Sequence, residues 1–190
     1  RLLAGNSFSL VYEKVVEKTT EQLRLAKAAK AAGLPAPEPR VNILQFITHL
    51  KQICDHPRLY QASSFSRTDW SVCGKFAMLT SILAPVLSPS AASGDSVLIF
   101  TQYKEMLQMI RLFVAGAFKC MPLEFHGGMS TSARNAAVRA FQAKQCPVMC
   151  VSLRAGGVGL NLTAANHVVM FDLWWNPQVE AQAIDRCFRI

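Results

Sequence analysis

Two arginines and a glutamine near the end of the chain have types and spacing suited to phosphate binding. In the segment AQAIDRCFRI, Gln182, Arg186 and Arg189 fall at positions i, i+4 and i+7 of a helix, so they share one face. A guanidinium group is permanently charged and presents a planar fork of donors that matches phosphate oxygens. The alternative is a solvated face on which Asp185 and Arg189 pair at i, i+4.

The helix that carries these residues has a clear predicted start. Asn176 suits the N-cap, Pro177 the first helical position and Glu180 the first turn. Trp174 and Trp175 stand directly before it. Core or interface packing is one interpretation of the two tryptophans, and an indole that projects into a groove of bound nucleic acid is the other.

A glycine-rich stretch, SLRAGGVGLNLTAAN, could bring backbone N–H groups close to an anion. Its three glycines are Gly156, Gly157 and Gly159, and its side-chain donors are Ser152, Arg154 and Thr163. A generic glycine turn remains an alternative. A dinucleotide-binding fingerprint would need a small residue where Leu162 stands.

Several classes of site lack the residues they require. No GxxxxGK[ST] loop and no acidic box for magnesium are present, so the chain alone is not equipped to hold a nucleoside triphosphate. The six cysteines form no CxxC pair, and we expect reduced, mostly buried thiols and no metal site. The net charge of +8 favours a polyanionic partner, first of all nucleic acid. We expect no membrane association, because no apolar run reaches roughly 18 residues.

Short apolar runs alternate with helical patterns in the second half of the chain. The predicted strands are 97–101, 121–125, 147–152 and 167–172, and continuous apolar strands of this kind indicate a parallel sheet covered on both faces. Ligands bind at the carboxyl ends of such strands, where polar and glycine-rich residues accumulate here. The fold class is therefore α/β.

The first part of the chain has a different pattern. Helical periodicity over 9–32 and again over 40–57 predicts a helical appendage, and a further helix is expected over 74–87. We accordingly expect a helical linker over 1–72 and an α/β lobe over 73–190.

The segments LKQICDHPRLY, GKFAMLTSIL, SVLIFTQYKEML, EFHGGMSTSARNAAVRAFQ and VMCVSLRAGGVGLNLTAANHVVMFDLWWNPQVEAQAIDRCFRI resemble the C-terminal RecA-like lobe of Swi/Snf-type ATPases of helicase superfamily two. The resemblance implies a DNA-dependent ATPase motor that moves along duplex DNA, with ATP and its Mg²⁺ held by a first RecA-like lobe outside this chain. Within the family, the WWNPQVEAQ pattern is most similar to the subgroup of repair and transcription-termination translocases. The resemblance also implies roles in chromatin remodelling or DNA repair.

The resemblance assigns roles to residues through three motifs, and to two more residues through the polar position after the HGG turn (Ser130) and the tryptophan before Asn-Pro (Trp175). QAIDRCFRI is similar to the sixth helicase motif, which makes Arg186 and Arg189 arginine fingers and Gln182 the motif's glutamine. Such fingers stabilise charge on the transferred phosphoryl group. SLRAGGVGLNLT is similar to the fifth motif and IFTQY to the fourth. The implied nucleotide contacts are Gly157, Gly159 and Asn161, and the implied DNA backbone contacts are Thr101, Gln102, Ser130, Ser152, Arg154 and Trp175.

The chain ends inside the sixth motif and begins without a first lobe, so we expect a truncated lobe that is inactive by itself. Two other functions remain open: a lobe of an RNA helicase, and a catalytically idle scaffold. The expected location is nuclear in a eukaryote and cytoplasmic otherwise.

Overall fold

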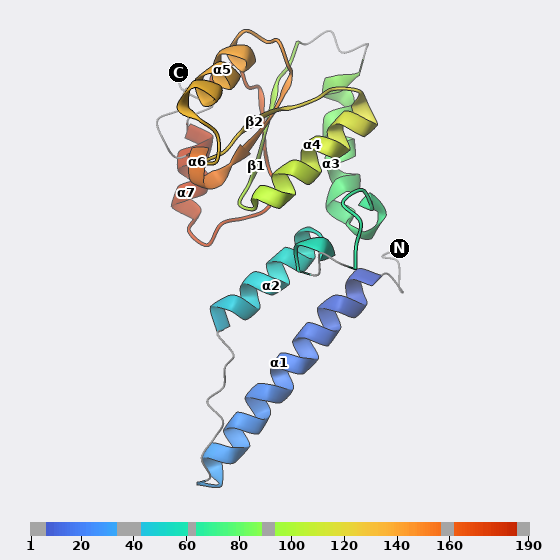
Figure 1. Cartoon of the computed structure of the whole chain (residues 1–190), viewed down its shortest axis with the longest axis vertical. Coiled ribbons are helices and arrows are strands. Elements are labelled where there is room, and N and C mark those ends of the chain that lie inside the picture. The colour runs from blue at the N-terminus through green and yellow to red at the C-terminus, as the bar shows by residue number, and fades with distance from the viewer. Residues whose placement is uncertain (1–6, 34–42, 61–63, 89–93, 157–161, 186–190) are drawn as a thin grey trace. The chain divides into compact units, whose positions relative to one another are not determined.

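The computed structural model describes residues 7–33, 43–60, 64–88, 94–156 and 162–185 (Figure 1). The chain divides into two units, Arg1–Cys73 and Gly74–Ile190. Within the described residues, no helix combines the length and the apolar character needed to cross a membrane.

The first unit is helical. Helix α1 spans Ser7–Ala31 and packs on α2, Ile43–Asp55, whose apolar residues recur at helical spacing and include the buried Ile53. Two 3₁₀ turns, η1 Pro57–Leu59 and η2 Trp70–Val72, follow. The buried His56 fastens this end, because its Nδ1 accepts a hydrogen bond from Arg58 N (3.1 Å) and its Nε2 lies 3.0 Å from Asp69 O.

The second unit contains a four-stranded parallel sheet in the order β2-β3-β1-β4. The strands are β1 Val97–Thr101, β2 Leu123–Phe125, β3 Val148–Ser152 and β4 His167–Met170. Every residue of β1 is buried, as a central strand covered on both faces requires. In the register, Thr101 pairs with Ser152 and Phe100 with Met170.

Helices cover both faces of this sheet (Figure 1). On one face lie α3, Gly74–Leu87, and α4, Lys104–Phe118; on the other lie α5, Thr131–Gln142, α6, Leu153–Gly156, and α7, Pro177–Asp185. On the α3 side, the ring of Phe76 lies 4.8 Å from that of Phe113. The alternate residues Leu98 and Phe100 face the other core, where they join Phe141 of α5.

These elements confirm the predicted α/β fold with a RecA-like parallel sheet and an N-terminal helical part. All four predicted strands exist, although β2 begins at Leu123 rather than at residue 121 and β4 ends at Met170 rather than at residue 172. The third predicted helix has the expected bounds, Gly74–Leu87.

Candidate nucleotide and nucleic-acid interface

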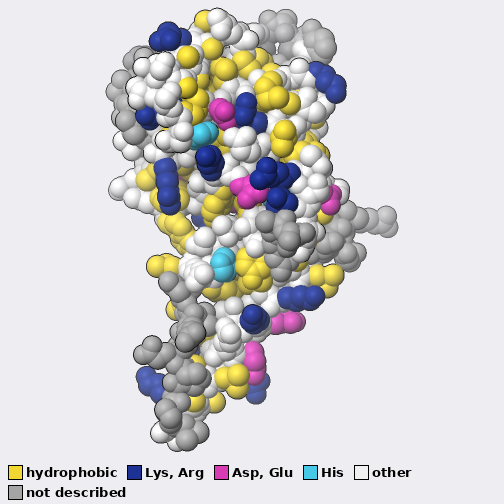
Figure 2. Space-filling view, in the orientation of Figure 1, with side chains coloured by type: hydrophobic (Ala, Val, Ile, Leu, Met, Phe, Trp, Pro, Cys, Tyr) yellow, Lys and Arg dark blue, Asp and Glu magenta, His cyan; other side chains and the backbone are white. Residues whose placement is uncertain are grey.

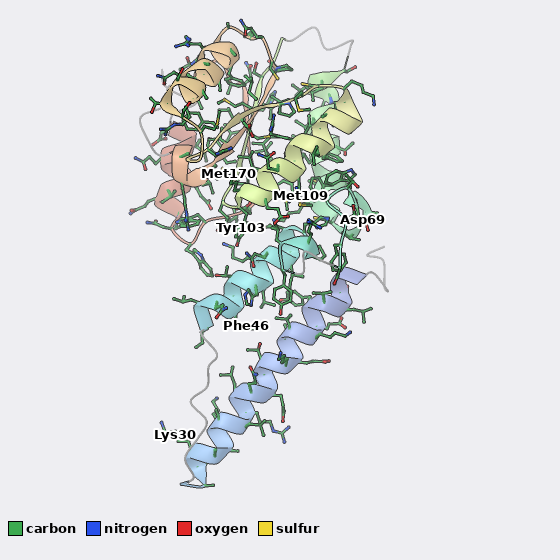
Figure 3. The ribbon with its side chains drawn as sticks, viewed as in Figure 1. Lys30, Phe46, Asp69, Tyr103, Met109 and Met170 are labelled. Carbon is green, nitrogen blue, oxygen red and sulfur yellow. The ribbon has the colours of Figure 1, made fainter. Side chains whose placement is uncertain are left out.

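Because all four strands are parallel, their carboxyl ends form one edge of the sheet, and most of the predicted site residues that the structure describes lie along it. Thr101 ends β1 and Ser152 ends β3 as paired neighbours. Met170 ends β4 (Figure 3). Tyr103 lies at the N-cap of α4, one residue beyond Gln102 (Figure 3). This edge is the candidate interface.

The centre of the edge is a buried carboxylate, that of Asp172. The hydroxyl of Thr101 donates a short hydrogen bond to its Oδ2, and the backbone N–H of Gln102 donates to its Oδ1 at 2.9 Å. Burial raises the pKa of Asp172 above its ordinary value, against the hydrogen bonds from Thr101 and Gln102 and the charge of Lys75, which lower it. The carboxylate therefore joins the ends of β1 and β4.

Thr101 and Gln102 differ in what they offer to a ligand. The Thr101 side chain is fully buried and its hydroxyl is directed at Asp172, so it holds the edge together from inside. The Gln102 side chain is half-buried, and its Nε2 donates to Leu173 O at 3.3 Å. Direct phosphate contact by either side chain stays a prediction.

Lys75 secures the same edge from helix α3. Its ammonium group donates to the carbonyl oxygen of Phe171 at 2.8 Å and lies 5.4 Å from the centre of that residue's ring. The Phe171 ring in turn packs 5.4 Å from that of Phe76. The start of α3 is thereby held beside the segment that follows β4.

The turn after β2 is built around His126. This buried ring accepts a hydrogen bond from Gly128 N at 3.1 Å, and its Nε2 lies 3.7 Å from Glu124 Oε2. A Cβ atom on Gly128 would lie 3.2 Å from the ring, whereas one on Gly127 would meet nothing within 4 Å. Glycine at position 128 therefore lets the backbone fold onto the histidine.

Ser130 follows this turn and begins helix α5. Its hydroxyl accepts a hydrogen bond from Ala133 N at 3.2 Å, which is the bond of an N-cap. The side chain is exposed. An exposed helix N-terminus has the polarity that favours an anion, but the predicted contact with DNA is not tested by this geometry.

The two tryptophans have different surroundings. Trp174 is half-buried against the core beneath α7, and the guanidinium of Arg154 lies 5.5 Å from its ring. Trp175 is 49% exposed. Of the two alternatives left open by the sequence, Trp174 takes the packed position and Trp175 the outward one. The Arg154–Trp174 pair was not predicted.

Helix α7 begins as predicted. Asn176 Oδ1 accepts from Gln178 N at 3.0 Å, Pro177 is the first helical residue, and Glu180 accepts a hydrogen bond from Trp174 N. Ala183 is buried and Gln182 is exposed, so the face predicted for phosphate binding is directed away from the core where it is described. Five predicted site residues lie outside the described residues: Gly157, Gly159, Asn161, Arg186 and Arg189.

The basic side chains of this unit are dispersed rather than gathered in one block, as Figure 2 shows for one face. Within the described ranges, no three His, Cys, Asp or Glu side chains converge as ligands for a metal ion. On this face, the described basic side chains therefore form no single patch.

The chain is similar to a known protein family and to several curated relatives. Residues 74–190 match the helicase conserved C-terminal domain. The putative ATP-dependent helicase/translocase YwqA of Bacillus subtilis is 38% identical over 95% of this chain and 18% of that protein. DNA repair protein RAD5 of Saccharomyces cerevisiae is 32% identical over 85% of this chain and 14% of that protein.

Among solved structures, the Sulfolobus solfataricus SWI2/SNF2 ATPase core in complex with dsDNA superposes with a TM-score of 0.72 and 30% identity, over 96% of this chain and 35% of that one. The chain therefore belongs to the helicase C-terminal domain family, as a RecA-like lobe of the SWI2/SNF2 type. It spans less than a fifth of the length of the two curated relatives.

Proposed function

We propose that this lobe is the second half of an ATP-dependent translocase on duplex DNA, which works in chromatin remodelling or DNA repair. The match to a SWI2/SNF2 core in complex with dsDNA over 96% of the chain carries the proposal. The carboxyl edge of the sheet supports it, because exposed polar groups, a helix N-terminus and an outward tryptophan lie along it. Nuclear location follows for a eukaryotic source and cytoplasmic location for any other.

The nucleotide is shared with another lobe in this proposal. ATP supplies the γ-phosphoryl group, and the first RecA-like lobe holds it with Mg²⁺, since the described residues of this chain contain no cluster of three or more side chains that could bind a metal ion. Arg186 and Arg189, which follow α7 in the sequence, and Gln182 of α7 contribute donors to the phosphates from this lobe. Gly157, Gly159 and Asn161, which lie between β3 and β4 in the sequence, contribute contacts to the nucleotide.

The DNA is contacted along its backbone. Gln102, Ser130, Ser152, Arg154 and Trp175 line the edge, and Thr101 positions it through Asp172. Contacts to phosphate and sugar fix register but carry little sequence information. A translocase must bind every step of its track, so such contacts suit it. Residues 1–72 form the helical link to the first lobe.

The arginine assignment is tested in the full-length protein. Arg186→Ala and Arg189→Ala should each lower DNA-stimulated ATP hydrolysis by about 10³-fold or more, while the Kd for a DNA duplex changes little. Arg139→Ala is the matched control, because this exposed arginine lies on α5 away from the edge. Unchanged hydrolysis in both finger variants would overturn the assignment.

A separate experiment tests which nucleic acid stimulates hydrolysis. Hydrolysis should respond to duplex DNA and not to RNA, and a response to RNA alone would favour an RNA helicase. Trp175→Ala should reduce triplex displacement per ATP hydrolysed, because in this proposal the exposed indole contacts the groove of the DNA. Absence of hydrolysis with any nucleic acid would favour a scaffold.

A further inference from the structure

Two cysteines meet at the amino edge of the sheet, the edge opposite to the candidate interface. Cys120 precedes β2 and Cys146 precedes β3, and their sulfur atoms lie 3.9 Å apart. Each stands three residues before a paired position, since Leu123 is in register with Met149. Paired strands lie about 4.8 Å apart, and disulfides join Cα atoms separated by about 4.4–6.8 Å. The two backbone segments are therefore spaced for a disulfide.

The pair is open to small molecules. Both side chains are half-buried, and both line a depression of about 480 Å³ between the end of α4 and the start of β3. Its other lining residues include Leu87, Phe118, Met121 and Pro147. A peroxide molecule is far smaller than this space, so it can reach either sulfur.

The two thiols are not equivalent. The hydrogen bond from Cys120 lowers the pKa of Cys146 to about 6, aided by backbone hydrogen bonds at Val148 and Leu123 and opposed by burial. The same hydrogen bond, together with burial, raises the pKa of Cys120. Cys150 is fully buried, and burial raises the pKa of its thiol too. The opposite directions of the two pKa shifts favour Cys146 over Cys120 as the thiol that ionises first.

We propose that Cys120 and Cys146 form a peroxide-reactive pair, in which Cys146 is the nucleophile and Cys120 resolves the product as a disulfide. The Cys146 thiolate attacks a hydroperoxide oxygen, the O–O bond breaks, and hydroxide or alkoxide leaves, so that Cys146 becomes a sulfenic acid. The Cys120 sulfur then displaces that hydroxyl, the S–S bond forms, and water leaves with the thiol proton. Two electrons pass from the thiols to the peroxide.

The test is a stoichiometric oxidation of the protein by hydrogen peroxide at pH 7, followed by alkylation of remaining thiols and digestion with trypsin. The cleavage sites predict a cross-link between peptides 120–134 and 145–154 that disappears on reduction, with Cys150 of the second peptide alkylated and Cys146 not. Cys120→Ser should leave a sulfenic acid on Cys146, which dimedone traps. Cys146→Ser should slow oxidation of Cys120 at least about tenfold, because its thiolate supplies the attack.

Cys54 is the internal reference, because its side chain is exposed and lies in the other unit. Oxidation of Cys54 before the pair, or a sulfenic acid on Cys120 rather than Cys146, would overturn the proposal. Thermal unfolding identifies any variant that does not fold. If Cys146→Ser fails this check, the dimedone site in Cys120→Ser and the cross-link in the parent protein decide the outcome.

Discussion

The hydroxyl of Thr101 and the carboxylate of Asp172 are joined by a buried hydrogen bond between residues 71 positions apart in the chain. The bond connects the end of β1 to the segment that leads from β4 to α7. Both side chains are almost completely buried. The hydrogen bonds from Thr101 and Gln102 therefore replace those that the carboxylate would accept from water.

The pH dependence of stability should report this carboxylate. Because burial raises the pKa of Asp172 above 3.8, the folded state keeps its proton to higher pH than the unfolded state does. The free energy of unfolding therefore falls as the pH rises from about 3.8 through the folded pKa. Asp172→Asn should remove this fall when urea denaturation is measured at successive pH values. Asp185→Asn, at an exposed site, should retain it; equal slopes in all three proteins would contradict the prediction.

Alanine substitutions of the two adjacent tryptophans should lower the free energy of unfolding by different amounts. Trp174→Ala should lower the free energy of unfolding by about 2–3 kcal/mol, because the indole packs on the core and under Arg154. Trp175→Ala should cost only about 0.5 kcal/mol, since half of its surface is exposed. Chemical denaturation measures both. A larger loss at Trp175 would show that the two orientations are reversed.

The glycine turn provides a matched pair of substitutions. Gly128→Ala should destabilise the protein by about 1–3 kcal/mol, because the new Cβ atom meets the His126 ring at 3.2 Å and Lys104 Nζ at 3.3 Å. Gly127→Ala should be nearly neutral, because its Cβ would meet nothing within 4 Å. Thermal unfolding of the two variants compares them directly, and equal Tm values would refute the close approach.

Ser130 allows capping to be separated from DNA contact. Ser130→Asp keeps an N-cap acceptor and adds a charge that the helix N-terminus favours, so Tm should not fall. If the serine faces the DNA backbone, the added negative charge should weaken duplex binding several-fold, and more strongly at low salt. Ser130→Ala removes the N-cap acceptor without adding a charge, so it should lower the free energy of unfolding by about 1 kcal/mol. Duplex affinity that is unaffected by the aspartate would exclude the contact.

Local patterns predicted the elements well and their long-range contacts poorly. The apolar runs predicted the strands, and helical periodicity predicted the helix from Gly74 to Leu87. Asn176 and Pro177 predicted the start of α7. The Asp172–Thr101 bond and the contact of Arg154 with Trp174 join residues that no local pattern relates. The position of Asp172 at the end of the predicted strand 167–172 was the available signal for this residue. The proximity of Cys120 and Cys146 depends on strand register, which the sequence does not specify.

The bonds around Asp172 also have a geometric consequence for anything that binds at this edge. Gln102 is bonded to Asp172 and Leu173, and Trp175 follows two residues after Leu173, so the protein and not its ligand sets the spacing between the two backbone segments that carry these side chains. A surface with a constant internal spacing acts as a ruler against a polymer of repeating units. Displacement of the whole lobe by one repeat would then present the same contacts to the next unit.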